Sequence, residues 1–334
     1  MEKIRIAQIG TSANSHGRLI FPSISKQNDI FEVVGYALPE NEREKFPNEV
    51  KVFEGYREMS VEEILSDETI DAVAIETEEL YLTKYALMAA QAGKHIHMEK
   101  PGGIVLADFE ELIRIMKETG KVFHTGYMYR YNPAVIELMR KIKAGELGEI
   151  ISVEAQMNCI HPNEVRQWLG NFPGGMMFFL GCHLVDLVLQ IQGYPKAIIP
   201  YNKCTQVDGI TSEDFGMAIF EYDDGVSFVK TSACEIGGYA RRQFVVSGTK
   251  GTIELKPFEM TVEDGKLYTE KTEYYVNDWG NMGEKSKTEP YDRYDDMMAA
   301  FAAMARGEKE NPYTLDYELQ LYKTVLKACG SDGK

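Results

Sequence analysis

The chain has 334 residues, of which 44% are hydrophobic, so it is long enough to form two domains with ordinary cores. A formal net charge of -16 disfavours nucleic acid or an anionic membrane as a partner, because either would repel the protein. The five cysteines lie at long spacings without a CxxC pair, so neither a disulfide framework nor a metal site is predicted. No stretch reaches the roughly 20 apolar residues of a membrane span. These properties indicate a cytoplasmic protein that binds a small molecule.

Short apolar runs alternate with amphipathic segments through residues 1–126, which is typical of a parallel sheet with crossover helices. The clearest helices are predicted at residues 80–91 and 106–119, ended by Gly93 and Gly120. Six strands in Rossmann order are predicted at residues 4–9, 31–37, 51–53, 72–75, 95–98 and 122–125. We therefore expect residues 1–126 to form a dinucleotide-binding Rossmann domain.

The pattern changes near residue 127. A helix at residues 133–144 leads into a strand at residues 150–157, and Asp223-Asp224-Gly225 joins two further strands as a hairpin turn. Helices are predicted at residues 180–192, 292–305 and 316–328. Residues 127–334 are therefore expected to form an α+β substrate-binding and oligomerisation domain with a large, mostly antiparallel open sheet. Its C-terminal helices could pack back on the first domain.

The loop after the first predicted strand reads Gly10-Thr11-Ser12-Ala13-Asn14-Ser15, where a Rossmann fingerprint would read G-x-G-x-x-G/A. Gly10 permits the tight turn, and Ser12, Ala13 and Asn14 are expected to lie along a pyrophosphate bound at the helix N-terminus. By itself the motif is equally compatible with an ordinary strand-to-helix turn capped by Ser or Asn.

The second strand is followed by Leu38-Pro39-Glu40, where an acidic residue would bind the ribose hydroxyls. Leu38 occupies that position but cannot accept a hydrogen bond, so Glu40 or Asn41 would have to do so. Arg43 is near enough to keep NADP open, and the cofactor is expected to be NAD or NADP. The other residues expected to bind the cofactor are Thr77, Glu99 and Lys100.

His95-Ile96-His97-Met98-Glu99-Lys100-Pro101 places a lysine where a parallel strand ends, the edge at which open α/β sheets bind ligands. Such a lysine can donate to a substrate hydroxyl or carbonyl and take part in proton transfer. With Gly93 and Lys94, this segment resembles the Gfo/Idh/MocA family, the relatives of glucose-fructose oxidoreductase and inositol dehydrogenase.

The resemblance continues in three further blocks, at residues 126–133, at 174–175 with 181–186, and at 246–252. It implies that Lys100 and His183 are the catalytic pair, exchanging a hydroxyl proton while hydride passes to or from nicotinamide. Residues near the implied substrate site are Tyr127, Arg130, His161, Trp168 and Asp186, with His124, Tyr129 and Arg166 as further polar candidates.

One departure from the family pattern lies at Phe179, where dehydrogenases of this family usually carry an aspartate four residues before the histidine. Asp186 follows His183 by three residues and could orient its imidazole, or it could be a helix-packing residue. What replaces the missing acid is open at this point.

The function expected from the resemblance is NAD(P)-dependent oxidation or reduction of a secondary hydroxyl or keto group of a sugar, sugar derivative or polyol. Redox-assisted elimination or glycoside cleavage is a variant of it. The alternative is a non-catalytic regulatory or scaffold member, because Ser12, Leu38 and Phe179 all depart from the expected pattern. Apolar strand residues suggest a homodimer or homotetramer that pairs through the second sheet; they are Ile219, Val226, Phe228, Phe244 and Val246.

Overall fold

A computed structural model describes residues 2–333 of the chain, which divide into two compact units. The first unit comprises the residues up to Tyr127 together with Tyr294–Tyr322 and Gly333. The second comprises Met128–Arg293 and Lys323–Asp332. The division near residue 127 resembles the predicted one, but the segment Tyr294–Tyr322 belongs to the first unit. Between residues 2 and 333, no helix is long and apolar enough to span a bilayer.

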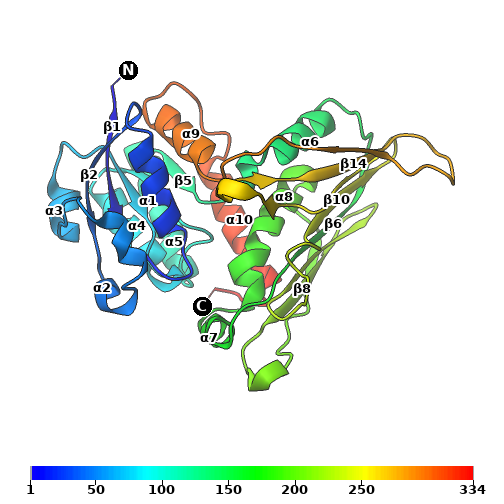
Figure 1. Cartoon of the computed structure of the whole chain (residues 1–334), viewed down its shortest axis with the longest axis horizontal. Helices are drawn as coiled ribbons and strands as arrows, with labels where there is room; N and C mark the ends of the chain where they lie inside the picture. The colour runs from blue at the N-terminus through cyan, green and yellow to red at the C-terminus, as the bar shows by residue number, and fades with distance from the viewer. Residues whose placement is uncertain (1, 334) are drawn as a thin grey trace. The chain divides into compact units, whose positions relative to one another are not determined.

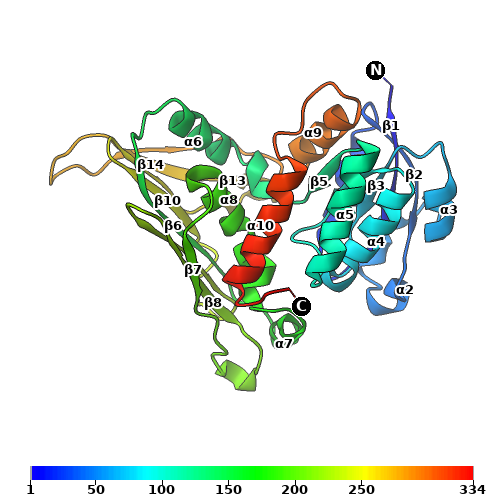
Figure 2. The ribbon, with the colours of Figure 1, turned by 180° about the vertical axis from the view of Figure 1, so that it is seen from behind.

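The first unit is built on a parallel sheet with the strand order β2-β1-β3-β4-β5. Helix α1, which contacts α9, lies on one face of this sheet, and the packed pair α4 and α5 lies on the other (Figures 1 and 2). The strands are β1 (Ile4–Ile9), β2 (Phe31–Ala37), β3 (Ala72–Ile75), β4 (His95–Met98) and β5 (Phe123–Thr125). The helices are α1 (Gly17–Lys26), α2 (Glu42–Lys45), α3 (Val61–Ser66), α4 (Leu82–Gln91), α5 (Leu106–Thr119) and α9 (Asp295–Ala305). The predicted Rossmann-like architecture is confirmed.

The predicted strand at residues 51–53 is wrong, so the sheet has five strands instead of six. These residues end the 3₁₀ helix Glu49–Phe53, whose Phe53 ring packs 4.6 Å from Phe21 and 4.4 Å from Tyr36. The apolar side chains are buried as expected, but three residues are too few to distinguish a strand from a helical turn.

The second unit contains an eight-stranded sheet with the order β15-β14-β11-β10-β6-β9-β8-β7. All neighbouring strands in it are antiparallel except β6 and β9, so the predicted mostly antiparallel open sheet is confirmed. The strands are β6 (Ile150–Asn158), β7 (Ala197–Pro200), β8 (Phe215–Glu221), β9 (Val226–Ser232), β10 (Gln243–Gly248), β11 (Thr252–Leu255), β14 (Glu270–Tyr274) and β15 (Glu284–Lys287). A separate small hairpin pairs β12 (Met260–Thr261) with β13 (Leu267–Tyr268).

One face of this sheet packs against α8 (Cys182–Gln192) and the π-helix that precedes it (Met177–Gly181). Phe220, Phe244 and Val246 point to that face and are fully buried. Ile219 and Phe228 alternate with buried neighbours and are partly exposed on the opposite face. Of the apolar residues proposed for an exposed face, Phe244 and Val246 therefore belong to the core instead.

Three further helices complete the second unit: α6 (Pro133–Lys143), α7 (Asn163–Trp168) and the end of α10 (Leu315–Ala328). Helix α6 begins where sequence chemistry predicts, because the Asn132 side chain accepts from Ala134 N at 2.9 Å and Pro133 needs no donor partner. The predicted helix at residues 180–192 begins earlier, as a π-helix at Met177. Such wide helical turns are frequent at functional sites.

Candidate active site

Gly10 and Thr77 meet at the carboxyl ends of β1 and β3, where the strand order of the first sheet reverses. Ligands of open α/β sheets bind at this switch point. Gly10 has φ +86°, and a Cβ there would lie 2.3 Å from Thr77 Cγ2. Glycine is therefore required at this position, both for its conformation and for the close approach of Thr77. The fit supports the predicted dinucleotide site.

Two serines shape the loop in place of the second and third fingerprint glycines. Ser12 Oγ accepts from Ser15 N at 2.8 Å and from Asn14 N at 3.2 Å. Ser15 Oγ accepts from Ser12 N at 3.0 Å and donates to Glu76 O at 2.9 Å. Ala13 between them is exposed. The loop thus retains a compact turn before α1 despite lacking two glycines.

Leu38 and Glu40, both expected to lie at the cofactor, have partners within the first unit. Leu38 packs against the Phe21–Tyr36–Phe53 cluster. Glu40 Oε1 accepts from Lys84 Nζ at 2.6 Å and from Tyr85 OH at 2.7 Å. The carboxylate that contacts the loop after β1 is that of Glu42, which sequence reasoning missed.

Lys100 lies at the end of β4 with its ammonium group enclosed beside Glu99. Its Nζ is 3.3 Å from Glu99 Oε1, and both side chains are at most 1% exposed. His16 Nδ1 approaches the other oxygen of Glu99 at 3.0 Å. Burial alone would raise the pKa of Glu99, but His16 and Lys100 hold it below its ordinary value. Glu99 is therefore an ionised carboxylate next to the lysine.

Two more enclosed acids follow β3. Burial raises the pKa of Glu79 to about 7 and that of Glu76 well above its ordinary value. His97 Nε2 is 3.5 Å from Glu76 Oε1, and His97 Nδ1 is 2.8 Å from Nδ1 of His124. Burial lowers the pKa of His97 to about 4, so its ring is neutral near pH 7. Except for His124, none of these groups was predicted as a site residue, although the strands β3, β4 and β5, which precede or carry them, were predicted.

Tyr127 is the last residue of the N-terminal segment of the first unit, and it is 1% exposed. The remaining site candidates lie in the second unit. His183, in the first turn of α8, is buried, and the ring of Tyr129 stands edge-on to it with centroids 5.1 Å apart. Tyr129 in turn donates to Glu259 at 2.8 Å.

Asp186 is paired with Arg130. Its two oxygens accept from Arg130 Nε at 2.9 Å and Nη2 at 2.8 Å, and Gln190 donates to it at 2.8 Å. Both charged side chains are enclosed. Arg130 thus holds the Asp186 carboxylate in a bidentate ion pair, and the role of Asp186 toward His183 stays a prediction.

Phe179 occupies the place of the missing acid and belongs to an apolar cluster with Cys159, Leu169, Met176 and Ala233. Its ring lies 5.2 Å from Trp168 and 5.9 Å from His161, measured between centroids. Burial, assisted by Arg242, lowers the pKa of His161 to about 4. An aromatic patch with a neutral histidine thus replaces the carboxylate.

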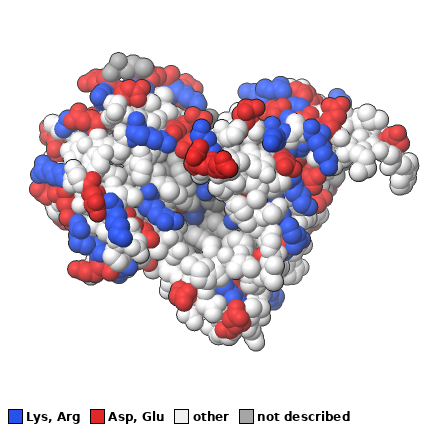
Figure 3. Space-filling model, viewed as in Figure 1, with Lys and Arg blue, Asp and Glu red and all other residues white. Residues whose placement is uncertain are grey.

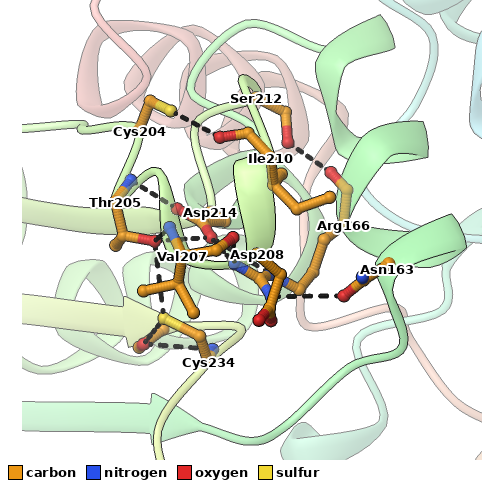
Figure 4. Close-up of polar contacts among 11 residues, drawn as sticks. Asn163, Arg166, Cys204, Thr205, Val207, Asp208, Ile210, Ser212, Asp214 and Cys234 are labelled. Carbon is orange, nitrogen blue, oxygen red and sulfur yellow. Dashed lines mark hydrogen bonds and ion pairs between the residues drawn. The ribbon is translucent and has the colours of Figure 1, made fainter.

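Arg166, a further polar candidate, has structural partners (Figure 4). Its guanidinium donates to Asp214 at 2.7 Å and to Asp208 at 2.8 Å, and also to Val207 O at 2.8 Å. Thr205 N donates to the other oxygen of Asp214 at 2.8 Å. Arg166 therefore fixes the segment 205–214 to α7.

The chain matches the models of two known protein domain families. Residues 4–127 match the model of the oxidoreductase family with an NAD-binding Rossmann fold, and residues 135–254 match the GFO/IDH/MocA C-terminal domain. The chain therefore belongs to the Gfo/Idh/MocA family of oxidoreductases, with NAD or NADP as its cofactor.

Its relatives include an uncharacterised oxidoreductase of Rhizobium meliloti, 24% identical over 97% of this chain and 96% of that protein. The NADP(+)-dependent scyllo-inositol 2-dehydrogenase of Bacillus subtilis is 26% identical over 48% of this chain and 46% of its own length. Among solved structures, the aldose-aldose oxidoreductase of Caulobacter crescentus aligns with a TM-score of 0.79 at 18% identity. That alignment covers 99% of this chain and 98% of the other.

Proposed function

We propose that the protein oxidises or reduces a secondary hydroxyl or keto group of a sugar, sugar derivative or polyol. The observation that carries this proposal is the enclosed Lys100–Glu99 pair at the end of β4, in the unit that forms the dinucleotide-binding fold. Relatives named for inositol and aldose substrates support the substrate class. Redox-assisted elimination or glycoside cleavage is a variant of the same chemistry.

Gly10, Ser12, Ala13 and Asn14 would hold the pyrophosphate of the cofactor, and Thr77 would border the nicotinamide half. The bound nicotinamide supplies hydride transfer. Lys100 would donate a hydrogen bond to the reacting oxygen and exchange its proton, while Glu99 fixes the position of the ammonium group. His183 is proposed as the second proton-exchanging group, on the family resemblance.

The substrate is expected to meet aromatic surface in the second unit. Trp168 and Phe179 stand nearly perpendicular, with an interplanar angle of 86°, and His161 adjoins Phe179. The indole Nε1 of Trp168 and Nε2 of His161 are buried without hydrogen-bond partners within residues 2–333. They could donate to or accept from substrate hydroxyls, while an aromatic ring covers the apolar face of a sugar. The Arg130–Asp186 pair is proposed to border this surface, and Tyr127 is proposed as a substrate-binding residue on the family resemblance.

The test combines binding and turnover. Purified protein is titrated with NADH and NADPH by fluorescence, and turnover is then measured with polyols, aldoses and glycosides. Lys100→Met should retain cofactor binding and lose turnover. Lys94→Met is the matched control, because Lys94 is also buried but lies before β4, where its Nζ donates to the backbone oxygens of Asp67 and Ile70. Wild-type turnover in Lys100→Met would overturn the proposal, and absence of dinucleotide binding would favour the non-catalytic alternative.

We further propose that the enzyme is a cytoplasmic homodimer or homotetramer that pairs through the second sheet. Ile219 and Phe228 are partly exposed on the face away from α8, and the β14–β15 hairpin ends in Val276, Trp279 and Met282, which are 68%, 108% and 77% exposed. The tip of this hairpin is largely uncharged (Figure 3). Apolar surface of this kind is typical of protein–protein contacts. A monomeric mass by light scattering would contradict the proposal.

A further inference from the structure

His16 links the enclosed Lys100–Glu99 pair to the protein surface. Its Nδ1 lies 3.1 Å from Glu99 Oε1 and 3.0 Å from Glu99 Oε2, and the same Oε1 lies 3.3 Å from Lys100 Nζ. The side chains of Lys100 and Glu99 are at most 1% exposed, whereas that of His16 is 19% exposed. One carboxylate oxygen therefore contacts both the enclosed lysine and an imidazole that water can reach.

The start of α1 holds this imidazole beside Glu99. His16 is the N-cap residue of α1, but its side chain makes no capping hydrogen bond. The next residue is Gly17, where a Cβ would lie 2.9 Å from Glu76 Cβ, so glycine lets the start of the helix approach the residue after β3 closely. The ring of Tyr294 packs on His16 with centroids 5.4 Å apart. These contacts fix the imidazole at the carboxyl ends of the strands.

Other titratable groups near the pair do not lead to the surface. Glu76, Glu79 and His97 interact electrostatically with it, and His124 contacts His97. Each of these four side chains is buried. His97 lies 3.5 Å from Glu76 Oε1 and 2.8 Å from His124 Nδ1, so these contacts connect enclosed groups with one another. Of these side chains and that of His16, only the His16 imidazole reaches water.

We propose that His16 and Glu99 relay protons between Lys100 and water during turnover. This inference rests on the proposed redox function. In the oxidation direction, a hydride passes from the substrate carbon to the nicotinamide, and the hydroxyl proton passes to the Lys100 amine, which becomes an ammonium. The ammonium then gives a proton to Glu99 Oε1, the carboxyl group gives it to His16 Nδ1, and the imidazole releases a proton to water. Lys100 and Glu99 regain their starting forms, and reduction reverses these steps.

Such a relay is fast enough for turnover. A lysine ammonium and a glutamate carboxyl ordinarily differ in pKa by about 6, so the uphill transfer is about 10⁶-fold slower than the limit of about 6 × 10¹² s⁻¹. His16 and Lys100 hold the pKa of Glu99 below its ordinary value, which slows the transfer further. Even about a further hundredfold slowing leaves about 6 × 10⁴ s⁻¹, above the usual kcat of about 1–10³ s⁻¹. The 3.3 Å contact is of the kind that shortens when substrate binds.

Replacement of His16 by glutamine separates a relay from a positioning role. A glutamine amide can still donate a hydrogen bond to Glu99, but it does not take up and release a proton near pH 7. We expect His16→Gln and His16→Ala to lower kcat by about tenfold to about a hundredfold, with KM and the affinity for NADH unchanged. Free imidazole should restore turnover to His16→Ala, because it can occupy the space that the ring leaves.

His95→Gln is the matched control. His95 lies at the start of β4, where its Nδ1 accepts from Val122 N at 3.1 Å, a bond that the glutamine oxygen can replace. This variant should keep the wild-type kcat and should not respond to imidazole. Wild-type kcat in His16→Gln would overturn the relay and leave the proposed function intact, even if His16→Ala were impaired.

Proton exchange of the Lys100 ammonium tests the relay without substrate or cofactor. Nuclear magnetic resonance of protein with isotope-labelled lysine side chains measures it, and Lys100→Met assigns the signal. Exchange with water should be at least about tenfold slower in His16→Gln than in the wild type. Exchange at Lys94, whose Nζ donates to backbone oxygens, should not change.

The same measurement distinguishes failure of the relay from failure of the proposed function. Unchanged exchange of Lys100 in His16→Gln would overturn the relay, whatever the turnover of the wild-type protein. A wild-type protein that neither binds a dinucleotide nor turns over any substrate of the panel would overturn the proposed function. Slower Lys100 exchange in His16→Gln would then still support the proton path.

Discussion

Lys100 Nζ lies 3.3 Å from Glu99 Oε1, and the two charged groups are enclosed together at the end of a parallel strand. An ion pair removed from water is costly to form, so a structural role alone would be served as well by apolar side chains. The position of this pair, at the ligand-binding edge of a Rossmann-like sheet, supports the proposed role of the lysine in proton transfer.

Replacement of Lys100 should therefore affect chemistry more than folding. We expect Lys100→Met to lower kcat/KM by about 10²–10⁴, the usual contribution of a positioned proton-transfer group. Glu99 would keep its contact with His16 Nδ1, at 3.0 Å, in this variant. Kinetics with the best substrate of the panel, together with urea unfolding of the same preparations, measure the two effects separately. A variant that is folded and fully active would exclude Lys100 from catalysis.

Most strands and helices could be predicted from the sequence, because the strands of both sheets contain regular runs of apolar residues that become buried. Helix α5 has the predicted bounds, since its apolar stripe is ended by Gly120 in a left-handed conformation at φ 65°. The family motifs likewise drew attention to Lys100 and His183, whose catalytic roles stay predictions. Phe53 misled the prediction because its burial reflects aromatic packing and not strand pairing.

The hydrogen-bond partners of the polar side chains could not be predicted, because they lie on segments that are distant in the sequence. Thr11 and Glu42 are 31 positions apart, and Arg130 and Asp186 are 56 positions apart. Glu40 and Asn41 turn the chain with positive φ, and only the folded backbone shows that the next residue, Glu42, contacts Thr11 N. The spacing of Asp186 on α8 likewise gave no sign of its pairing with Arg130.

Breaking the enclosed Arg130–Asp186 pair should strongly destabilise the protein. Loss of one partner leaves a buried charge uncompensated, so we expect Asp186→Ala to lower the free energy of unfolding by about 3–5 kcal/mol. Urea denaturation monitored by tryptophan fluorescence checks this value. The control is Glu146→Gln, which breaks the exposed pair with Arg140 and should cost less than about 1 kcal/mol. Equal losses in the two variants would contradict the bidentate geometry.

The site of Phe179 should not tolerate the aspartate that the family pattern led us to expect there. The side chain packs against Met176 and Trp168, so Phe179→Asp would bury a carboxyl group without a designed partner and remove aromatic packing. We expect a loss of at least about 3 kcal/mol in the free energy of unfolding. Phe179→Leu, which retains an apolar side chain, should lose less than half as much. A stable Phe179→Asp variant with higher turnover would show instead that the site still accommodates the family's carboxylate.

The last prediction concerns pH and Glu42. Burial raises the pKa of Glu42 from its ordinary value of 4.5 to about 9 in the folded protein. Between pH 4.5 and pH 9, the carboxyl group is therefore protonated in the folded state and ionised in the unfolded state. The unfolded state then binds fewer protons, and the contribution of Glu42 to stability is complete below pH 4.5 and falls as the pH rises toward 9. Glu42→Gln cannot ionise and lacks this dependence.

The difference in unfolding free energy between Glu42→Gln and the wild type should therefore grow in favour of the variant from about pH 5 to about pH 8, by about 1 kcal/mol per pH unit. Titrations of all other groups are common to both proteins and cancel in this difference. Urea unfolding at several pH values measures it, with Glu44→Gln expected to stay within about 0.5 kcal/mol of the wild type throughout. A difference that does not change with pH would mean that Glu42 is ionised in the folded protein, and that its carboxylate reaches solvent or a cation as an ordinary surface acid does.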